Sequence, residues 1–193
     1  ALYTSLGFAE ERVIVPIRAG YGGSDPVPKS ENYTTRTIED IRAVMAAEGV
    51  EGCPVMSIGA DSRYAFHLNA AYPGSVTAII ATGGLLPITR PEQYERMHKH
   101  FRFIMTCARY TPRFLPFMVK AGYHLARKKG KRAYVQAVFG GSKGDLATTE
   151  DPRVFEAMVT GSEISLSDDH SAHEAFARQV IDGGRAVCED AGI

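Results

Sequence analysis

Apolar residues in the first 86 positions follow two different spacings. Short, almost continuous apolar runs occur at 12–17, 53–58 and 76–82, with the sequences RVIVPI, CPVMSI and VTAIIAT. Runs of this kind are typical of buried parallel strands. Between them, apolar residues recur at helical spacing in 34–49 and 62–73. The order strand, helix, strand, helix, strand predicts an α/β fold with a parallel sheet.

The remainder of the chain, residues 87–193, has no comparable run and is typical of helices. Pro91 is placed as in the first turn of a helix, and Asp151 precedes Pro152 as a cap precedes a first-turn proline. Gly49 suits the end of the helix predicted over 34–49. We therefore expect a partial α/β core over residues 1–88 and an all-helical lid or cap over 89–193.

Composition limits the class of protein. The chain has 193 residues, of which 45% are hydrophobic and 23% charged, as in ordinary globular domains. Lys+Arg and Asp+Glu both number 22, so net charge does not favour a nucleic-acid partner. A basic run at 127–132 is typical of a solvated helix end. No apolar run approaches the length of a membrane span, so no membrane association is expected.

The cysteines and the first residue add two expectations. Cys53, Cys107 and Cys188 are far apart and form no CxxC pair, so neither a zinc site nor a disulfide framework is indicated. No leader peptide is visible, which together with three thiols indicates a cytoplasmic protein. The first residue is Ala1 rather than Met, and we expect a segment of a longer chain.

The loop after the first apolar run carries a resemblance to a known family. VIVPIRAGYGGSDP, at 13–26, resembles the α/β-hydrolase segment in which a strand leads into D-R-P-G-Y-G-x-S-D. The similarity covers roughly residues 5–88, and the helical remainder is similar to the lid that many members insert. Segments 38–45, 62–73 and 86–97 look most like the hydrolase-like domains of bacterial LuxR-type transcriptional regulators.

The resemblance directs attention to the turn after residues 53–58, where the family carries its nucleophile in a G-x-nucleophile-x-G elbow. Ten residues on from Gly49, and fourteen back from Pro73, the family's spacing reaches Gly59. In that register, Gly59 and Ala60 form the elbow position and no nucleophile is present. A second register places Asp61 at the tip, the residue type that epoxide hydrolases and haloalkane dehalogenases use. A third places Ser62 there.

The histidines also favour a degenerate site. The family's catalytic histidine follows a late strand, and no strand is predicted after the lid. The histidines are His67, His98, His100, His124, His170 and His173. His170, His173 and Glu174 have helical spacing that suits a metal, but an acidic helix start explains them more simply. We expect no metal and no cofactor.

A ligand pocket is the remaining candidate site. In the family, the loop that holds Arg18 and Tyr21 lies near the mouth of the active site. An apolar cluster in the lid includes Phe101, Met105 and Phe117. Packing of the core accounts for most of that cluster, and part of it is expected to cover a small hydrophobic ligand.

Three functions follow as hypotheses. The resemblance implies a catalytically degenerate, ligand-binding sensor of a transcriptional regulator, which reaches DNA only through a domain outside this chain. A second copy of the chain, in a homodimer, is a further candidate partner. The alternative is an active ester, epoxide or haloalkane hydrolase with Asp61 as nucleophile and the rest of its triad outside this chain. The third is a scaffold whose basic and aromatic lid helices bind another protein.

The strand order of the family predicts a gap in the sheet of this chain. It places another strand between those expected at 12–17 and 53–58, which leaves them about 9–10 Å apart. An empty slot would expose two rows of unpaired backbone groups, so another polypeptide segment must fill it. Direct pairing of the two runs would contradict this expectation.

Overall fold

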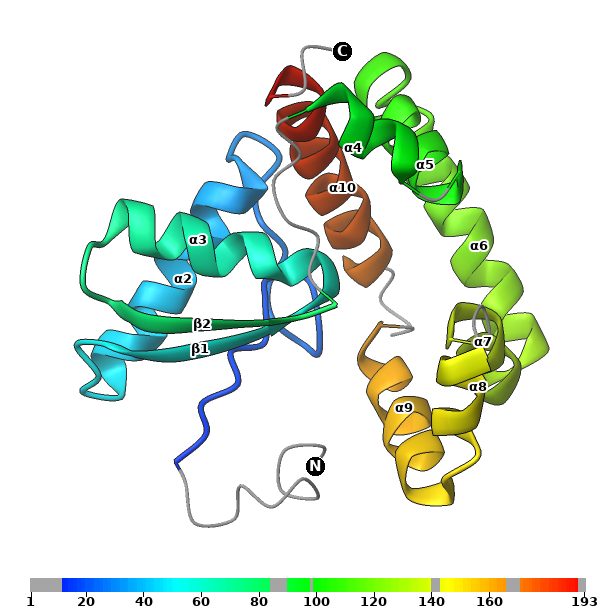
Figure 1. Ribbon diagram of the computed structural model, residues 1–193, viewed down its shortest axis with the longest axis horizontal. Coiled ribbons are helices and arrows are strands. Elements are labelled where there is room, and N and C mark those ends of the chain that lie inside the picture. Colours follow the sequence, from blue (N-terminus) through cyan, green and yellow to red (C-terminus); the bar gives the residue numbers. More distant parts are fainter. Residues whose placement is uncertain (1–11, 84–89, 98, 140–142, 166–170, 191–193) are drawn as a thin grey trace. The chain divides into compact units, whose positions relative to one another are not determined.

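The computed structural model describes residues 12–83, 90–97, 99–139, 143–165 and 171–190 (Figure 1). The chain divides into two compact units. The first comprises Ala1–Pro26 and Pro116–Phe176, and the second comprises Val27–Leu115 and Ala177–Ile193. The domain boundary predicted after residue 88 depends on the change from strand-like to helix-like sequence patterns. It falls inside the second unit and stays a prediction.

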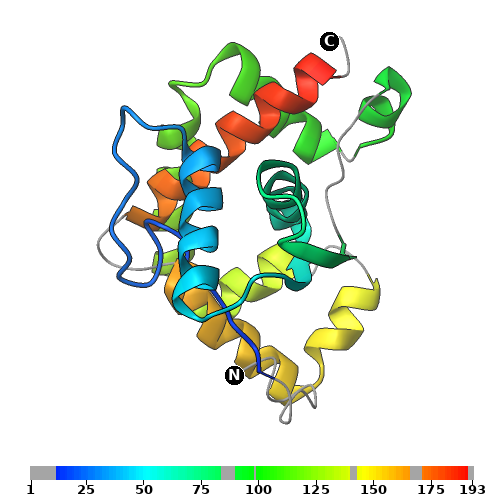
Figure 2. The same ribbon diagram turned by 90° about the vertical axis from the view of Figure 1, so that its left-hand side faces the viewer.

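The second unit contains a small parallel sheet. Strand β1 (Cys53–Ile58) pairs in parallel with β2 (Val76–Thr82), and the helix α3 (Ser62–Ala71) connects them after a 3-10 turn, η1 (Gly59–Asp61). Helix α3 packs against both strands and against α2 (Tyr33–Ala47) (Figure 2). Two of the three predicted strands, both predicted helices and the α/β class are thereby confirmed.

The ends of α2 follow from single residues. The Asn32 side chain accepts a hydrogen bond from the Thr35 amide at 2.9 Å, which satisfies a donor that the first helical turn leaves unpaired. At the other end, Gly49 has a φ of 68°, a left-handed conformation that stops the helix. The predicted C-terminal stop at Gly49 is confirmed.

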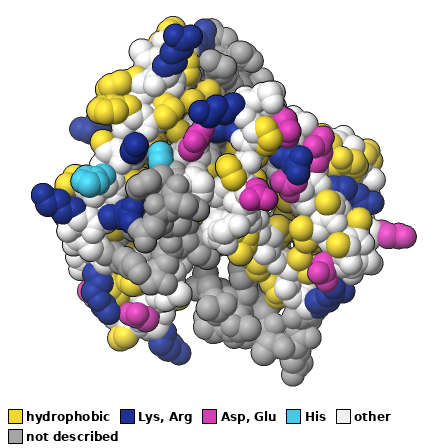
Figure 3. Space-filling model, turned by 180° about the vertical axis from the view of Figure 1, so that it is seen from behind, with side chains coloured by type: hydrophobic (Ala, Val, Ile, Leu, Met, Phe, Trp, Pro, Cys, Tyr) yellow, Lys and Arg dark blue, Asp and Glu magenta, His cyan; other side chains and the backbone are white. Residues whose placement is uncertain are grey.

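Side chains on the two faces of the sheet differ in solvent exposure. On β1, Cys53, Val55 and Ser57 are half-buried or buried, whereas the alternate side chains are exposed. Met56, Ile58 and Ile80 are 38%, 52% and 48% exposed. Apolar side chains of the sheet are therefore exposed in this unit. Figure 3 shows hydrophobic and charged side chains interspersed on one face of the molecule.

The strand predicted at 12–17 is wrong. Residues 12–18 have no regular secondary structure, and Val13, Val15 and Ile17 are 43%, 60% and 51% exposed. An extended run becomes a strand only where a neighbour pairs with its backbone, and within the described residues the sheet holds β1 and β2 alone. The direct pairing with 53–58 that would contradict a missing strand is not observed. The missing strand itself stays a prediction.

The described residues from Pro91 onward form helices and short connections and contain no strand, as predicted for a helical lid. Helix α9 begins as expected, since the Asp151 carboxylate accepts a hydrogen bond from the Arg153 amide at 2.9 Å. Hydrogen bonds from Arg153 lower the pKa of that carboxyl. The helices are α4 (Pro91–Arg96), α5 (Lys99–Tyr110), α6 (Leu115–Lys129), α7 (Lys131–Phe139), α8 (Lys143–Thr149), α9 (Pro152–Ser165) and α10 (Ser171–Asp190).

Within the second unit, Arg178 of α10 ties the chain before α2 in place. Its guanidinium donates hydrogen bonds to the carbonyls of Val27, Pro28 and Glu31. It also lies over the Tyr33 ring, 5.7 Å from the centroid. Because Val27 and Tyr33 are buried, these bonds satisfy backbone groups at the edge of the core.

Replacing Arg178 with lysine tests this tie. Lysine keeps the charge but cannot reproduce the planar fork, so we expect the Arg178→Lys variant to lose about 1–3 kcal/mol of free energy of unfolding in urea. The matched control is Arg36→Lys, which alters an exposed ion pair with Asp40 and should change that free energy by less than about 0.5 kcal/mol. Equal effects of the two substitutions would contradict the role of Arg178.

Candidate functional site

The candidate site is the turn that follows β1. Ile58 is still extended, with φ −121° and ψ 133°, and the next residue, Gly59, has a φ of 61°. Asp61 and Ser62 have φ values of −74° and −54°, in the helical region. The residue with the left-handed conformation is therefore Gly59, as the first register predicted. Ala60 follows within η1 and is exposed.

Conformation, rather than lack of space, requires glycine at this position. A Cβ built on Gly59 would have no heavy atom within 4 Å outside its chain neighbours. A side chain there would consequently point into open space, as a nucleophile would need to. The residue present has none to offer.

The two rival nucleophiles are held by hydrogen bonds within the unit. The carboxylate of Asp61 accepts a hydrogen bond from the Gln179 side-chain amide at 2.8 Å. Ser62 is fully buried, and its hydroxyl donates to the carbonyl of Gly59 at 2.9 Å. A buried hydroxyl in the first turn of a helix cannot reach a substrate. The structure therefore gives Ser62 a structural role at the start of α3.

An arginine network closes the space beside the turn. The Arg63 guanidinium donates to the Thr34 hydroxyl and to the Gln179 carbonyl, the latter at 3.5 Å. The Thr34 amide and hydroxyl lie 3.4 and 3.5 Å from the Asp182 carboxylate. A Cβ added at Gly183 would overlap the same guanidinium. These bonds join α3, α2 and α10 next to the turn, while Nε of Arg63 and the buried hydroxyl of Ser57 at the end of β1 have no hydrogen-bond partner among the described residues.

Substitution of Gly59 tests whether its backbone conformation requires glycine. We expect the Gly59→Ala variant to lose about 1–2 kcal/mol of free energy of unfolding, because a Cβ is strained at this φ. The matched control is Gly122→Ala within α6, which also has open space around it and should instead gain about 0.5–1 kcal/mol. A stabilising Gly59→Ala substitution, measured in urea, would show that the turn tolerates a side chain.

Arg63 also affects a histidine on α3. Partial loss of solvent around the imidazole of His67, which is otherwise exposed, and then the positive charge of Arg63 lower its pKa below the ordinary value of 6.5. The unfolded chain therefore takes up this proton at a higher pH than the folded chain does. As a result, acidification through about pH 6.5 favours unfolding.

The His67→Gln variant removes this proton. Between about pH 7.5 and about pH 5.5, we expect the urea midpoint of the variant to fall less than that of the parent protein. At the upper pH, where His67 is neutral in both states, the two midpoints should differ least. An identical acid dependence in both proteins would contradict the assignment.

The predicted pocket residues fall in both units. In the first unit, the Arg18 guanidinium lies over the Tyr21 ring at 5.0 Å, and Phe117 is 66% exposed on α6. In the second unit, Phe101 and Met105 lie on α5, with 51% and 6% of their surface exposed. Arg18 and Tyr21 are brought together, while the set as a whole stays a prediction.

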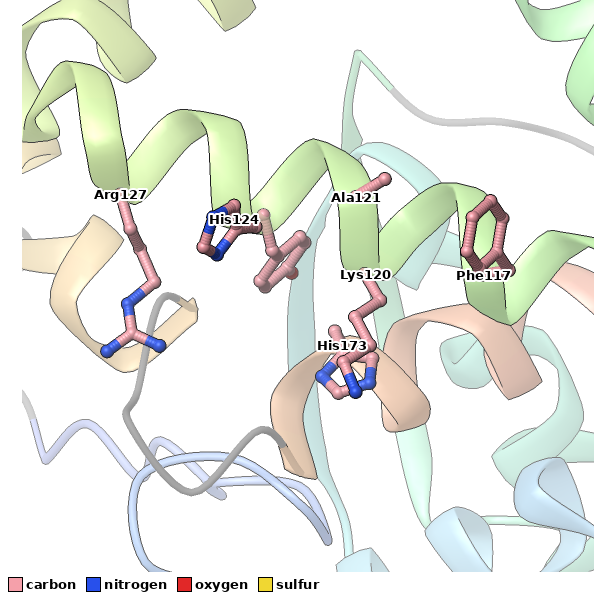
Figure 4. Close-up of a pocket in the computed structure, with 7 residues that line it drawn as sticks. Phe117, Lys120, Ala121, His124, Arg127 and His173 are labelled. Carbon is pink, nitrogen blue, oxygen red and sulfur yellow. The ribbon is translucent and has the colours of Figure 1, made fainter.

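A cavity of about 260 Å³ lies along α6 in the first unit (Figure 4). It contains one predicted residue, Phe117. The sequence did not predict the others, because most of those on α6 are polar residues and the prediction followed apolar ones. His173 lies on α10, far away in the sequence. The lining residues are Phe117, Lys120, Ala121, Tyr123, His124, Arg127 and His173.

Metal ligands and thiols are not assembled in the part of the chain that the structure describes. No group of three or more His, Cys, Asp or Glu residues able to hold a metal ion occurs there. His170, one of the three residues considered for a metal, lies outside the described residues. Cys53 and Cys107 are free thiols, half-buried and buried respectively.

Comparisons of this chain with protein-family models, curated proteins and solved structures find no match. Of the helices among the described residues, none combines the length and the apolar character that crossing a bilayer requires. The function therefore has to be inferred from the residues and their geometry.

Proposed function

We propose that this chain is an α/β-hydrolase-like domain without hydrolytic activity that binds a small ligand. The observation that carries the proposal is Gly59, which follows a parallel strand directly and has a φ of 61°. In a working hydrolase, the nucleophile occupies the sharp turn between such a strand and a helix. A glycine in such a turn offers no nucleophile, which supports the absence of hydrolysis.

The surroundings of the turn support this proposal. Asp61 is held by Gln179, and the Ser62 hydroxyl is bonded to the Gly59 carbonyl inside the core. An aspartate nucleophile must present an oxygen to the substrate along an open approach. The hydrogen bond from the Gln179 amide gives this carboxylate a structural task instead.

The proposed role is that of a sensor. Segments 38–45, 62–73 and 86–97 resemble the hydrolase-like domains of LuxR-type regulators. In this role the domain binds its ligand in the cytoplasm and acts on DNA through a domain outside this chain. A regulator needs binding without turnover, which is the combination that the glycine turn favours.

An assay of hydrolysis tests the proposal. We expect the protein to hydrolyse p-nitrophenyl acetate, p-nitrophenyl butyrate and styrene oxide no faster than buffer. The Asp61→Ala variant should show the same background rate, since there is no activity for it to lose.

A positive result would have a defined signature. Turnover that disappears in Asp61→Ala and persists in Ser62→Ala would establish the hydrolase alternative. An ester adduct on Asp61, detected by mass spectrometry after incubation with the epoxide, would do the same because that chemistry proceeds through a covalent intermediate.

A further inference from the structure

We propose that the cavity along α6 binds a small aromatic carboxylate. The inference names the ligand class for the proposed sensor, and so it rests on the ligand-binding part of the proposed function. It concerns the residues of the first unit alone. The cavity is called the cationic cavity below, for the lining residues Lys120 and Arg127; His124 and His173 also line it.

Among the described lining residues, the side chains that are charged at neutral pH, Lys120 and Arg127, are both positive. Lys120, His124 and Arg127 are spaced by four and three residues, which places them along one face of α6. Lys120 and Arg127 are separated by about 10 Å along the helix axis, so an anion fits between them. Figure 4 shows the Lys120 side chain directed toward His173 of α10, and none of the lining residues that the structure describes is Asp or Glu.

The apolar part of the cavity comes from aromatic rings. Phe117 lies one turn before Lys120 and is 66% exposed, so a ligand ring that covers it removes apolar surface from water. The Tyr123 ring meets His173 edge-on, with centroids 6.3 Å apart. Burial, and then the neighbouring Tyr134, raise the pKa of the Tyr123 phenol. The phenol therefore stays neutral and does not repel an anion.

The size and the donors of the cavity narrow the ligand. Its volume of about 260 Å³ lies below the range of about 300–1,000 Å³ for drug-sized ligands, which indicates one or two rings. Arginine binds a carboxylate through two parallel hydrogen bonds, and lysine adds a point charge. A planar acid combines the anion and the ring that these walls match.

A simpler explanation accounts for only part of this arrangement. Arg127, Lys128 and Lys129 occupy the last turn of α6, where positive charge interacts favourably with the helix dipole. Lys120 and His124 lie too far from that end to contribute, because the effect is confined to the last turn. His173 belongs to a different helix. Helix stabilisation therefore leaves most of the cationic cavity unexplained.

Titration with 2-naphthoate tests the proposal on the full chain, with naphthoate fluorescence as the readout. We expect saturable binding, and we expect the neutral isostere 2-naphthamide to bind at least about tenfold more weakly because it lacks the charge. Acetate, which has the charge but no ring, should fail to compete at equal concentration. Absence of naphthoate binding, or equal binding of the amide, would overturn the proposal.

Variants locate the binding. The double substitution Lys120→Gln/Arg127→Gln should weaken naphthoate binding about tenfold or more. The matched control, Lys128→Gln/Lys129→Gln, removes the same charge from the same helix outside the cavity and should change the dissociation constant less than about twofold. An equal loss in both double variants would show that only net charge attracts the ligand and would overturn the proposal.

A third variant changes the space and leaves the charge alone. Ala121 lines the cavity and is exposed, so Ala121→Phe should fill the site without disturbing the core, and naphthoate binding should be lost. Circular dichroism of each variant shows whether α6 remains folded. Naphthoate binding to Ala121→Phe with parent affinity would place the ligand elsewhere.

The two proposals fail separately. If naphthoate does not bind while the esters and the epoxide remain intact, the cationic cavity is refuted and the absence of hydrolysis stands. If the protein turns over those substrates, the proposed absence of hydrolysis is refuted. The naphthoate titrations still test whether the cationic cavity binds an aromatic carboxylate.

Discussion

The guanidinium of Arg178 is the interaction on which the second unit depends most. The segment before α2 makes a bend in which Val27 is buried, and a buried carbonyl without a donor is costly. Arg178 donates to the Val27 carbonyl, also bonds the carbonyls of the exposed residues Pro28 and Glu31, and covers Tyr33. This fixes α10 against the start of α2. The neighbouring Gln179 is thereby positioned to reach Asp61, and one turn later Asp182 reaches Thr34.

This tie has a functional consequence at the turn after β1. A catalytic carboxylate needs a free approach, whereas Asp61 is fixed by an amide from α10 and Arg63 binds the same helix. The bonds of Asp61, Ser62 and Arg63 within the unit therefore support the proposed absence of hydrolysis. Gly59 completes this arrangement, since its conformation suits a nucleophile's turn and its side chain is absent.

The cationic cavity has the opposite character. Its lysine and arginine lie on one face of α6, with the exposed Phe117 ring one turn before the lysine. Positive charge at a concave surface attracts an anion, and an exposed ring favours an apolar body. Binding at α6 requires no chemistry from the turn after β1. Ligand binding at α6 is therefore compatible with a turn at Gly59 that lacks a nucleophile.

The sequence by itself determined the local features: β1 and β2 from their continuous apolar runs, the end of α2 from Gly49, the start of α9 from Asp151 and Pro152, and the glycine turn at residue 59. Each depends on residues within a few positions of one another. Tertiary structure alone decided that residues 12–17 form no strand, because a strand exists only with a partner that the run cannot supply. It also decided the bond from Gln179 to Asp61 and the meeting of Lys120 with His173 at one cavity. Such contacts join residues far apart in the chain, and periodicity carries no information about which distant side chains meet.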